Sequence, residues 1–322
     1  MPENTPTHNS GEILAAGFLP DDAMNALEAH YTVHHYYRAD DPAALLQEVA
    51  DNIVCMVGTS HALMSAELIN ALPNLQQISV YGTGTEKVDA SAAKARNITI
   101  TNTPDVMTSD VADLGMGLIL ATVRRMAEAD DFVRKGRSGS ESMPFSRSLG
   151  GKQLGIVGLG KIGSEIARRA EPFELKICYH TRNEKPDAPY PWYPDLLTMA
   201  AEVDILVLTA PGGEETFRMI DAQVLNALGP EGTLINVARG SLVDEKALVQ
   251  ALQDGTLGAA GLDVFEDLTN PSEALFSMPN VVLSPHRGSA THESRGDMAR
   301  LIVDNVNAFF AGRGAVTPLP DI

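Results

Sequence analysis

Three apolar runs of the chain each lead into a side chain that can take part in chemistry. The residues at their ends are Arg239, Asp263 and His286. An arginine binds a carboxylate with two hydrogen bonds and polarises a neighbouring carbonyl. A histidine passes a proton near neutral pH. Taken singly, Arg239 also fits a surface cation and His286 a core histidine. Together they predict proton transfer to a carbonyl group that lies beside a carboxylate.

A glycine-rich turn precedes these segments. An apolar strand is expected over Gln153–Val157, and it is followed by Gly158-Leu159-Gly160-Lys161-Ile162-Gly163 and by a helical apolar pattern. In such a turn Gly158 permits the tight bend, Gly160 lets the backbone approach a pyrophosphate, and Gly163 lets helix pack on strand. The start of the helix attracts phosphate charge. The segment therefore predicts a dinucleotide site, which would supply a hydride to the carbonyl.

The tip of the next strand, expected at Leu175–Tyr179, indicates which dinucleotide binds. It reads His180-Thr181-Arg182-Asn183, without an acid before Glu184. NAD sites usually place an Asp or Glu here for the ribose 2′-hydroxyl. A guanidinium instead pairs with the 2′-phosphate of NADP, and Thr181 and Asn183 can add neutral hydrogen bonds. The tip favours NADP(H), with a solvated loop arginine as the alternative.

Strands and helices alternate along most of the chain. One long helix is expected from about Asp110 to Gly136, with Gly115 and Gly117 allowing close packing on another helix. The Pro-rich stretch Lys185–Pro194 is expected to be a surface connection. Other strands are predicted at Ile53–Val57, Gln77–Tyr81, Ile98–Thr101, Ile205–Thr209, Thr233–Val237, Ala259–Asp263 and Val281–Ser284, and further helices at Ser65–Ala71, Ala90–Arg96 and Glu293–Phe310. This alternation predicts an α/β protein with two doubly wound lobes of parallel sheet.

Composition narrows the class of protein. The 322 residues suffice for two cores, and the formal net charge of −18 argues against nucleic-acid and anionic-membrane partners. An anionic substrate needs only a local basic pocket. Cys55 and Cys178 lie in apolar runs and are expected to be reduced core residues of a cytoplasmic protein. The polar stretch Met1 to Gly11 has no apolar signal core and is expected to be a frayed end.

The chain resembles the D-isomer-specific 2-hydroxyacid dehydrogenase family over most of its length. The resemblance is nearest to its NADPH-dependent glyoxylate/hydroxypyruvate and hydroxyphenylpyruvate reductases. The matching stretches are Tyr81–Asp89, Thr101–Pro104, Gly155–Gly163, Val237–Gly240, Gly261–Phe265 and Pro285–Thr291.

This resemblance implies a Rossmann cofactor domain at 102–287, inserted into a flavodoxin-like substrate domain formed by 1–101 and 288–322. The expected reaction reduces a small anionic 2-keto acid to the D-2-hydroxy acid. The helix after Thr108 normally belongs to a homodimer interface in this family. Glyoxylate, hydroxypyruvate, phenylpyruvate and keto-sugar acids all remain open as substrates.

The resemblance also assigns roles to single residues. Arg239 would bind the substrate carboxylate and keto oxygen, and His286 would be the acid/base. The backbone amides of Gly82, Thr83 and Gly84 would meet the carboxylate, and Asp263 would hold the nicotinamide carboxamide. The expected cofactor residues are Thr108, Gly158, Gly160, Lys161, Ile162, Gly163, Thr181, Arg182, Thr209, Ala210, Pro211, Val237, Ala238, Asp263 and Gly288.

One position departs from the family pattern. The family pairs its histidine with a glutamate five residues after the strand-end aspartate, and here that residue is Leu268. Glu266 or Asp267 could replace the missing acid if the loop takes another course. Otherwise the chain is a slow catalyst, or an NADP(H)-binding sensor or scaffold. A metal site at His286, His292 and Glu293 fits no common zinc spacing, and no metal is expected.

Overall fold

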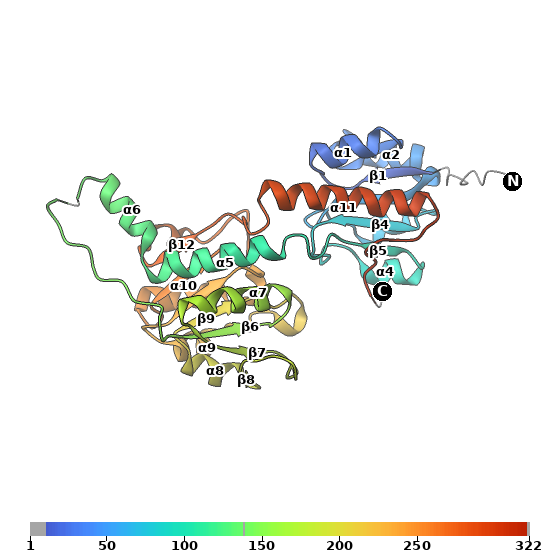
Figure 1. Cartoon of the computed structure of the whole chain (residues 1–322). Helices are drawn as coiled ribbons and strands as arrows, with labels where there is room; N and C mark the ends of the chain where they lie inside the picture. Colours follow the sequence, from blue (N-terminus) through green and yellow to red (C-terminus); the bar gives the residue numbers. More distant parts are fainter. Residues whose placement is uncertain (1–10, 138, 321–322) are drawn as a thin grey trace. The chain divides into compact units, whose positions relative to one another are not determined.

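The computed structural model describes residues 11–137 and 139–320. These residues form two compact units, each described by itself below (Figure 1). The terminal unit combines the two ends of the chain, up to Val106 and from His292 onward. The central unit runs from Met107 to Thr291. The expected frayed end, Met1 to Gly11, lies almost wholly outside the described residues.

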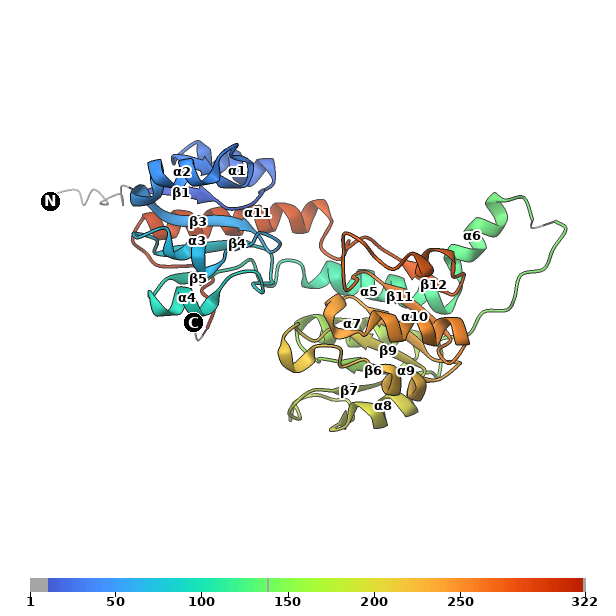
Figure 2. The same cartoon turned by 180° about the vertical axis from the view of Figure 1, so that it is seen from behind.

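The terminal unit is a five-stranded parallel sheet flanked by helices (Figure 2). Its strand order β2-β1-β3-β4-β5 is the flavodoxin-like order. The strands are β1 (Glu12–Ala15), β2 (Val33–His35), β3 (Ile53–Thr59), β4 (Gln77–Tyr81) and β5 (Thr99–Thr101). The helices are α1 (Asp21–Glu28), α2 (Pro42–Val49), α3 (Ala66–Asn70), α4 (Ala90–Ala95) and α11 (His292–Phe310).

The last helix ties the far end of the chain to this sheet. α11 packs against β4 and α1. Tyr31 donates a hydrogen bond of 2.8 Å to Asn307, and their neighbour Phe310 stacks on the Tyr31 ring. The buried amide of Gln77 donates to the carbonyl of Asn305 at 3.2 Å. These contacts make α11 part of the terminal unit although the central unit intervenes in the sequence.

The central unit is a seven-stranded, all-parallel sheet with helices on both faces. Its order, β12-β11-β10-β9-β6-β7-β8, is the dinucleotide-fold order extended by one strand. The strands are β6 (Gln153–Val157), β7 (Lys176–His180), β8 (Trp192–Tyr193), β9 (Ile205–Leu208), β10 (Thr233–Asn236), β11 (Ala259–Leu262) and β12 (Val281–Leu283). The helices are α5 (Thr108–Val123), α6 (Met126–Arg134), α7 (Lys161–Ala170), α8 (Leu196–Glu202), α9 (Ala222–Leu228) and α10 (Glu245–Asp254). The predicted fold class, a Rossmann lobe inserted into a flavodoxin-like lobe, is confirmed.

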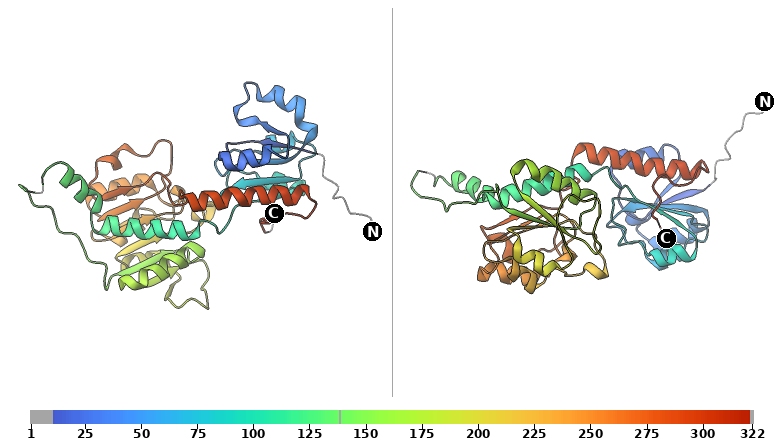
Figure 3. Two further views of the ribbon diagram at one scale, coloured as in Figure 1. Left: turned by 45° about the horizontal axis from the view of Figure 1, so that its top comes forward. Right: turned by 60° about the horizontal axis from the view of Figure 1, so that its bottom comes forward.

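The prediction of a single helix from Asp110 to Gly136 is wrong. Helix α5 ends at Val123, and Arg125 takes a left-handed conformation with φ of 53° before α6 starts. The buried side of α5 stops at the break, whereas no residue of α6 is buried. α6 projects from the rest of the central unit (Figure 3). Because α6 has no buried face, no packing against the core holds it on the axis of α5.

Two other expectations need correction. The Pro-rich stretch is not only a surface connection, because Trp192 and Tyr193 form the edge strand β8 beside β7. Gly115 does allow close packing, since a Cβ there would lie 2.8 Å from Ile166 Cδ1 on α7. Gly117 does not, because a Cβ there would meet nothing within 4 Å.

Among the described residues, no helix has the length and apolar character to span a membrane.

Candidate active site

The three chemically able side chains lie at one edge of the central sheet. β10, β11 and β12 are adjacent and parallel, and Arg239, Asp263 and His286 follow their respective carboxyl ends. Ligands in open α/β sheets bind outside these ends. The fold therefore brings together residues that are 47 positions apart in the sequence.

Asp263 organises the loop that carries His286. Its side chain is 1% exposed. One carboxylate oxygen accepts from the Ser284 hydroxyl at 2.5 Å and from the Arg287 amide at 2.7 Å, and the other accepts from the Gly288 amide at 3.0 Å. The sequence missed this role of Ser284. A carboxylate accepts about four hydrogen bonds, so one acceptor position remains on Asp263 for an external donor.

The turn after β10 is equally constrained around Arg239. The Asn236 side chain donates to the Arg239 carbonyl at 2.9 Å and accepts from the Ala238 amide at 3.0 Å. A Cβ at Gly240 would lie 1.8 Å from the Phe265 carbonyl oxygen. Only glycine permits this approach, which fixes the backbone on both sides of the partly buried arginine.

The glycines of the turn between β6 and α7 have three different surroundings. Gly158 has φ of 96°, and a Cβ there would lie 2.6 Å from the Ala210 amide. A Cβ at Gly163 would lie 2.3 Å from the Gly158 carbonyl oxygen. At Gly160 a Cβ would meet nothing within 4 Å, so the space beside this backbone is open. In the described structure no side chain caps α7. These surroundings fit a pyrophosphate at Gly160.

The other expected cofactor residues lie around this turn or at the strand ends. The Thr209 hydroxyl, after β9, bonds to the Gly158 carbonyl. Ala210, Val237 and Ala238 are buried, whereas Pro211 is exposed. Lys161 and Ile162 begin α7, and Thr108 begins α5.

The tip of β7 holds an ion pair that the sequence did not predict. The Arg182 guanidinium contacts the carboxylate of Glu215, which lies in the loop after β9. The side chains are 77% and 71% exposed. Thr181 donates to the Asn183 carbonyl at 2.6 Å, and its own carbonyl accepts from Trp192 at 3.1 Å. Sequence spacing did not mark Glu215, because it lies in the 3₁₀ turn Glu214–Thr216 and not directly at the end of β9.

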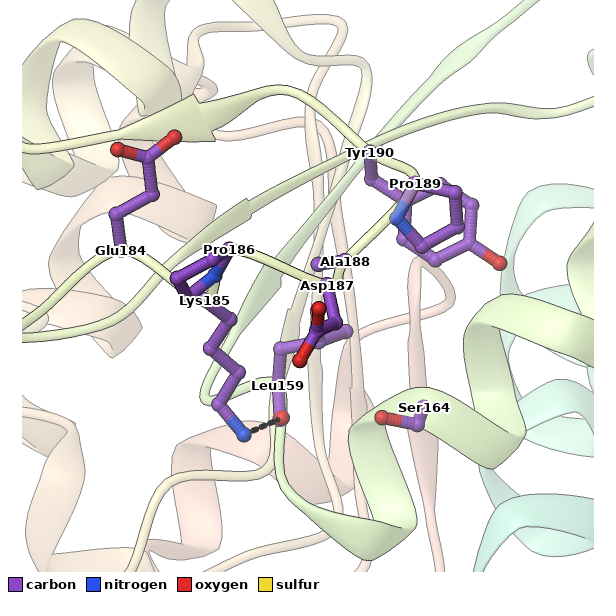
Figure 4. A pocket seen from close by; sticks show the side chains of 9 residues that line it. All are labelled: Leu159, Ser164, Glu184, Lys185, Pro186, Asp187, Ala188, Pro189 and Tyr190. Atoms are coloured by element: carbon purple, nitrogen blue, oxygen red, sulfur yellow. Dashed lines mark hydrogen bonds between the residues drawn. The ribbon is translucent and has the colours of Figure 1, made fainter.

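A cavity of about 500 Å³ adjoins the glycine turn (Figure 4). Lys185 reaches from its rim to the carbonyl of Leu159. The wall of this cavity includes none of the residues expected to bind the cofactor. The lining residues are Leu159, Ser164, Glu184, Lys185, Pro186, Asp187, Ala188, Pro189 and Tyr190.

Hydrogen bonds to one carboxylate hold both ends of the loop that carries Leu268. The carboxylate of Glu245, at the start of α10, accepts from the Glu266 amide at 2.9 Å and from the Ser272 amide at 3.0 Å. Leu268 lies between these two points and is 39% exposed. The sequence did not anticipate this clamp.

Both neighbouring acids of Leu268 are engaged by other residues. Glu266 binds Arg218 at 2.6 Å. Asp267 accepts from the hydroxyl and the amide of Thr269, and these bonds lower the pKa of its carboxyl group. For either acid to act beside His286, these contacts would have to break.

The expected substrate amides of Gly82, Thr83 and Gly84 follow β4 in the terminal unit. Gly82 has φ of 135°, and its amide donates to the Thr103 hydroxyl at 3.0 Å. The Thr83 carbonyl accepts from Asn102 at 2.9 Å. The two stretches matched to the family around β4 and β5 are thus bonded to each other.

Neither cysteine is in a disulfide, and both are buried. Burial raises the pKa of Cys55 to about 12 and that of Cys178 to about 11, so both thiols stay protonated. Over the described ranges, no group of His, Cys, Asp and Glu side chains is arranged to hold a metal ion.

Comparison with known proteins agrees with this geometry. The model of the D-isomer-specific 2-hydroxyacid dehydrogenase NAD-binding domain matches residues 116–288. The glyoxylate/hydroxypyruvate reductase A of Arabidopsis thaliana is 44% identical over 92% of this chain and 94% of its own. The hydroxyphenylpyruvate reductase of Plectranthus scutellarioides is 44% identical over 91% and 94%. The structure of an NADPH-dependent glyoxylate/hydroxypyruvate reductase from Sinorhizobium meliloti, with NADP and malonate, matches with a TM-score of 0.88 and 40% identity over 97% of both chains.

Proposed function

This chain belongs to the D-isomer-specific 2-hydroxyacid dehydrogenase family, and on this basis we propose that it reduces a small 2-keto acid to the D-2-hydroxy acid with NADPH. The observation that carries the proposal is the placement of Arg239, Asp263 and His286 at neighbouring strand ends. Relatives that reduce glyoxylate, hydroxypyruvate and hydroxyphenylpyruvate support the substrate class.

The central unit would hold the nicotinamide dinucleotide. The open space at Gly160 and the start of α7 would receive the pyrophosphate. Arg182 would meet the 2′-phosphate, joined by Thr181 once its hydroxyl leaves the Asn183 carbonyl. The remaining acceptor position of Asp263 would bind the carboxamide. The NADPH dependence of the Sinorhizobium meliloti relative supports this choice of cofactor.

The dinucleotide, when bound, supplies a hydride to the carbonyl carbon. Arg239 would bind the substrate carboxylate and stabilise negative charge on the keto oxygen. His286 would donate a proton to that oxygen, which leaves an alcohol and a neutral imidazole. The loop bonded to Asp263 would hold His286 in position for this step.

The terminal unit would bind the carboxylate end of the substrate through the backbone after β4. Amides of Thr83 and Gly84 would donate to the anion without adding charge, and the Gly82 amide would join them only by leaving the Thr103 hydroxyl. We also propose that the chain forms a homodimer in which α5 takes part. The two buried thiols fit a cytoplasmic setting.

A second function is favoured by one observation. Leu268 stands where the family has its glutamate, while Glu266 and Asp267 bond elsewhere. A protein of this kind would bind NADP(H) and turn over slowly, as a sensor or scaffold.

Turnover with NADPH distinguishes the two functions. The panel contains glyoxylate, hydroxypyruvate, phenylpyruvate and a keto-sugar acid, with NADPH oxidation as the readout. We expect efficient reduction of at least one of them to the D-hydroxy acid. Tight NADPH binding without turnover of any member would favour the sensor, and absence of dinucleotide binding would refute both.

A further inference from the structure

The acid that selects NAD at the tip of β7 is missing from the sequence there, but the structure brings one to the same place from another strand. Glu215, in the loop after β9, contacts the guanidinium of Arg182 directly. Arg182 follows the carboxyl end of β7, and Glu215 lies in the 3₁₀ turn Glu214–Thr216 that comes after β9. The adenosine half of a dinucleotide binds outside the carboxyl ends of these strands in this fold.

We propose that Glu215 is a cofactor-specificity residue that weakens the preference for NADPH and supports residual binding of NADH. This inference rests on the proposed function, because it concerns the same dinucleotide site. Its physical basis is that one carboxylate faces one guanidinium at the position of the ribose 2′-substituent.

Two effects of Glu215 act in the same direction. With NADPH, the 2′-phosphate competes with Glu215 for Arg182 and is repelled by its carboxylate. With NADH, the same carboxylate can accept a hydrogen bond from the 2′-hydroxyl. Arg182 alone would select strongly for phosphate, whereas the pair selects less strongly.

The exposure of the pair limits the size of the effect. Both side chains are more than 70% exposed, so water and salt screen their attraction. Removal of the Glu215 charge should therefore tighten NADPH binding by about two- to fivefold. Loss of the charged acceptor should weaken NADH binding by a similar factor of about two to five.

The test measures dinucleotide binding directly, without substrate. Dissociation constants for NADPH, NADH and adenosine 2′,5′-bisphosphate are determined by titration calorimetry for the unchanged protein and for Glu215→Gln. The matched control is Glu214→Gln, which removes the same charge from the adjacent exposed position of the same turn. We expect Glu215→Gln to tighten both phosphate-bearing ligands and to weaken NADH, while Glu214→Gln changes the two dinucleotides alike.

An Arg182→Ala background completes the cycle. In this background, Glu215→Gln should strengthen NADPH binding less than it does in the unchanged protein, because there is no guanidinium for which Glu215 and the 2′-phosphate compete. Lys185→Met tests whether the phosphate instead lies on the cavity side of the turn, where Lys185 contacts Leu159.

The outcomes separate the inference from the function. Equal changes for NADPH and NADH in Glu215→Gln would overturn the inference and leave the reductase proposal standing. So would a loss of NADPH selectivity in Lys185→Met but not in Arg182→Ala. Absence of dinucleotide binding by the unchanged protein would overturn the proposed function itself.

Discussion

The amide of His286 donates a hydrogen bond of 2.9 Å to the carbonyl oxygen of Asp263, and His286 itself has φ of 53°. A left-handed histidine is uncommon and needs support from its surroundings. That support comes from the aspartate, through its backbone and both oxygens of its carboxylate. Asp263 and His286 thus form one structural unit.

Asp263→Asn should disturb this unit. An amide NH₂ would face one of the amides or the hydroxyl that now donate to the carboxylate, which leaves a buried donor unpaired. We expect the free energy of unfolding to fall by about 1–3 kcal/mol and kcat to fall with it. Urea unfolding and initial rates measure these effects. Ser284→Ala, which removes a single donor, should have the smaller effect, and the reverse order would contradict this role of Asp263.

Substitution of the two proposed catalytic side chains should give different kinetic patterns. Arg239→Ala should raise KM and lower kcat, because its contact exists with bound substrate and strengthens in the transition state. His286→Ala should mainly lower kcat, by roughly 10²–10⁴, for a lost general acid. Steady-state kinetics with the best keto acid check both. Near-normal turnover in both variants would show that the assignment is wrong.

Leu268→Glu tests whether the leucine occupies the place of the missing acid. Reduction requires a protonated histidine, so the rate falls as pH rises through the histidine's titration. A carboxylate beside the ring favours the charged form and should move this descending limb upward by about 1–3 pH units, with a higher kcat near neutrality. Glu266→Gln and Asp267→Asn are the controls. An unmoved limb in Leu268→Glu, with a downward shift in a control, would assign the role to that acid.

Substitution of Gly160 and of Gly163 should affect dinucleotide binding and stability separately. In Gly160→Ala the added methyl group enters open space, so the free energy of unfolding should change by less than about 1 kcal/mol. Dinucleotide affinity should fall at least about tenfold, because the methyl group meets the pyrophosphate. Gly163→Ala meets the Gly158 carbonyl and should destabilise the fold by about 1–3 kcal/mol. Calorimetry and chemical unfolding distinguish the two. Unchanged affinity in a folded Gly160→Ala variant would move the pyrophosphate elsewhere.

Glu165 should contribute to stability only above acidic pH. Hydrogen bonds from Arg168 and then Arg169 lower the pKa of its carboxyl group to about 2, from an ordinary value of 4.5. The contribution is therefore present above about pH 5 and is lost as pH falls towards 2. Unfolding of Glu165→Gln should depend less on pH over this range, whereas the exposed control Glu48→Gln should follow the unchanged protein. If the free energy of unfolding depended on pH in the same way in both variants, Glu165 would make no such contribution.

The sequence predicted the elements that depend on local pattern. The strand Gln77–Tyr81 has its predicted bounds, and the glycine turn lies between its strand and its helix as expected. The sequence did not predict the break at Arg125, because the residues on both sides of it have a helical pattern of polar and apolar positions. Only the missing core contact of α6 distinguishes the two helices.

Contacts between distant segments were the other limit. The Arg182–Glu215 pair joins residues 33 positions apart, and the Glu245 clamp joins α10 to a loop more than 20 positions away. Each is a polar pairing that either residue could make with many others. Sequence spacing therefore indicated the strand-end residues but not their partners.

The clamp at Glu245 has a consequence for protein engineering. Because one carboxylate fixes both ends of the loop between Glu266 and Ser272, the intervening residues form a cassette whose anchor points belong to the scaffold. Whole loops from glutamate-bearing relatives can be grafted between these anchors without redesign of α10. The chain is thus a ready recipient for transplanted loops, on which the contribution of a catalytic acid can be measured in an otherwise constant protein.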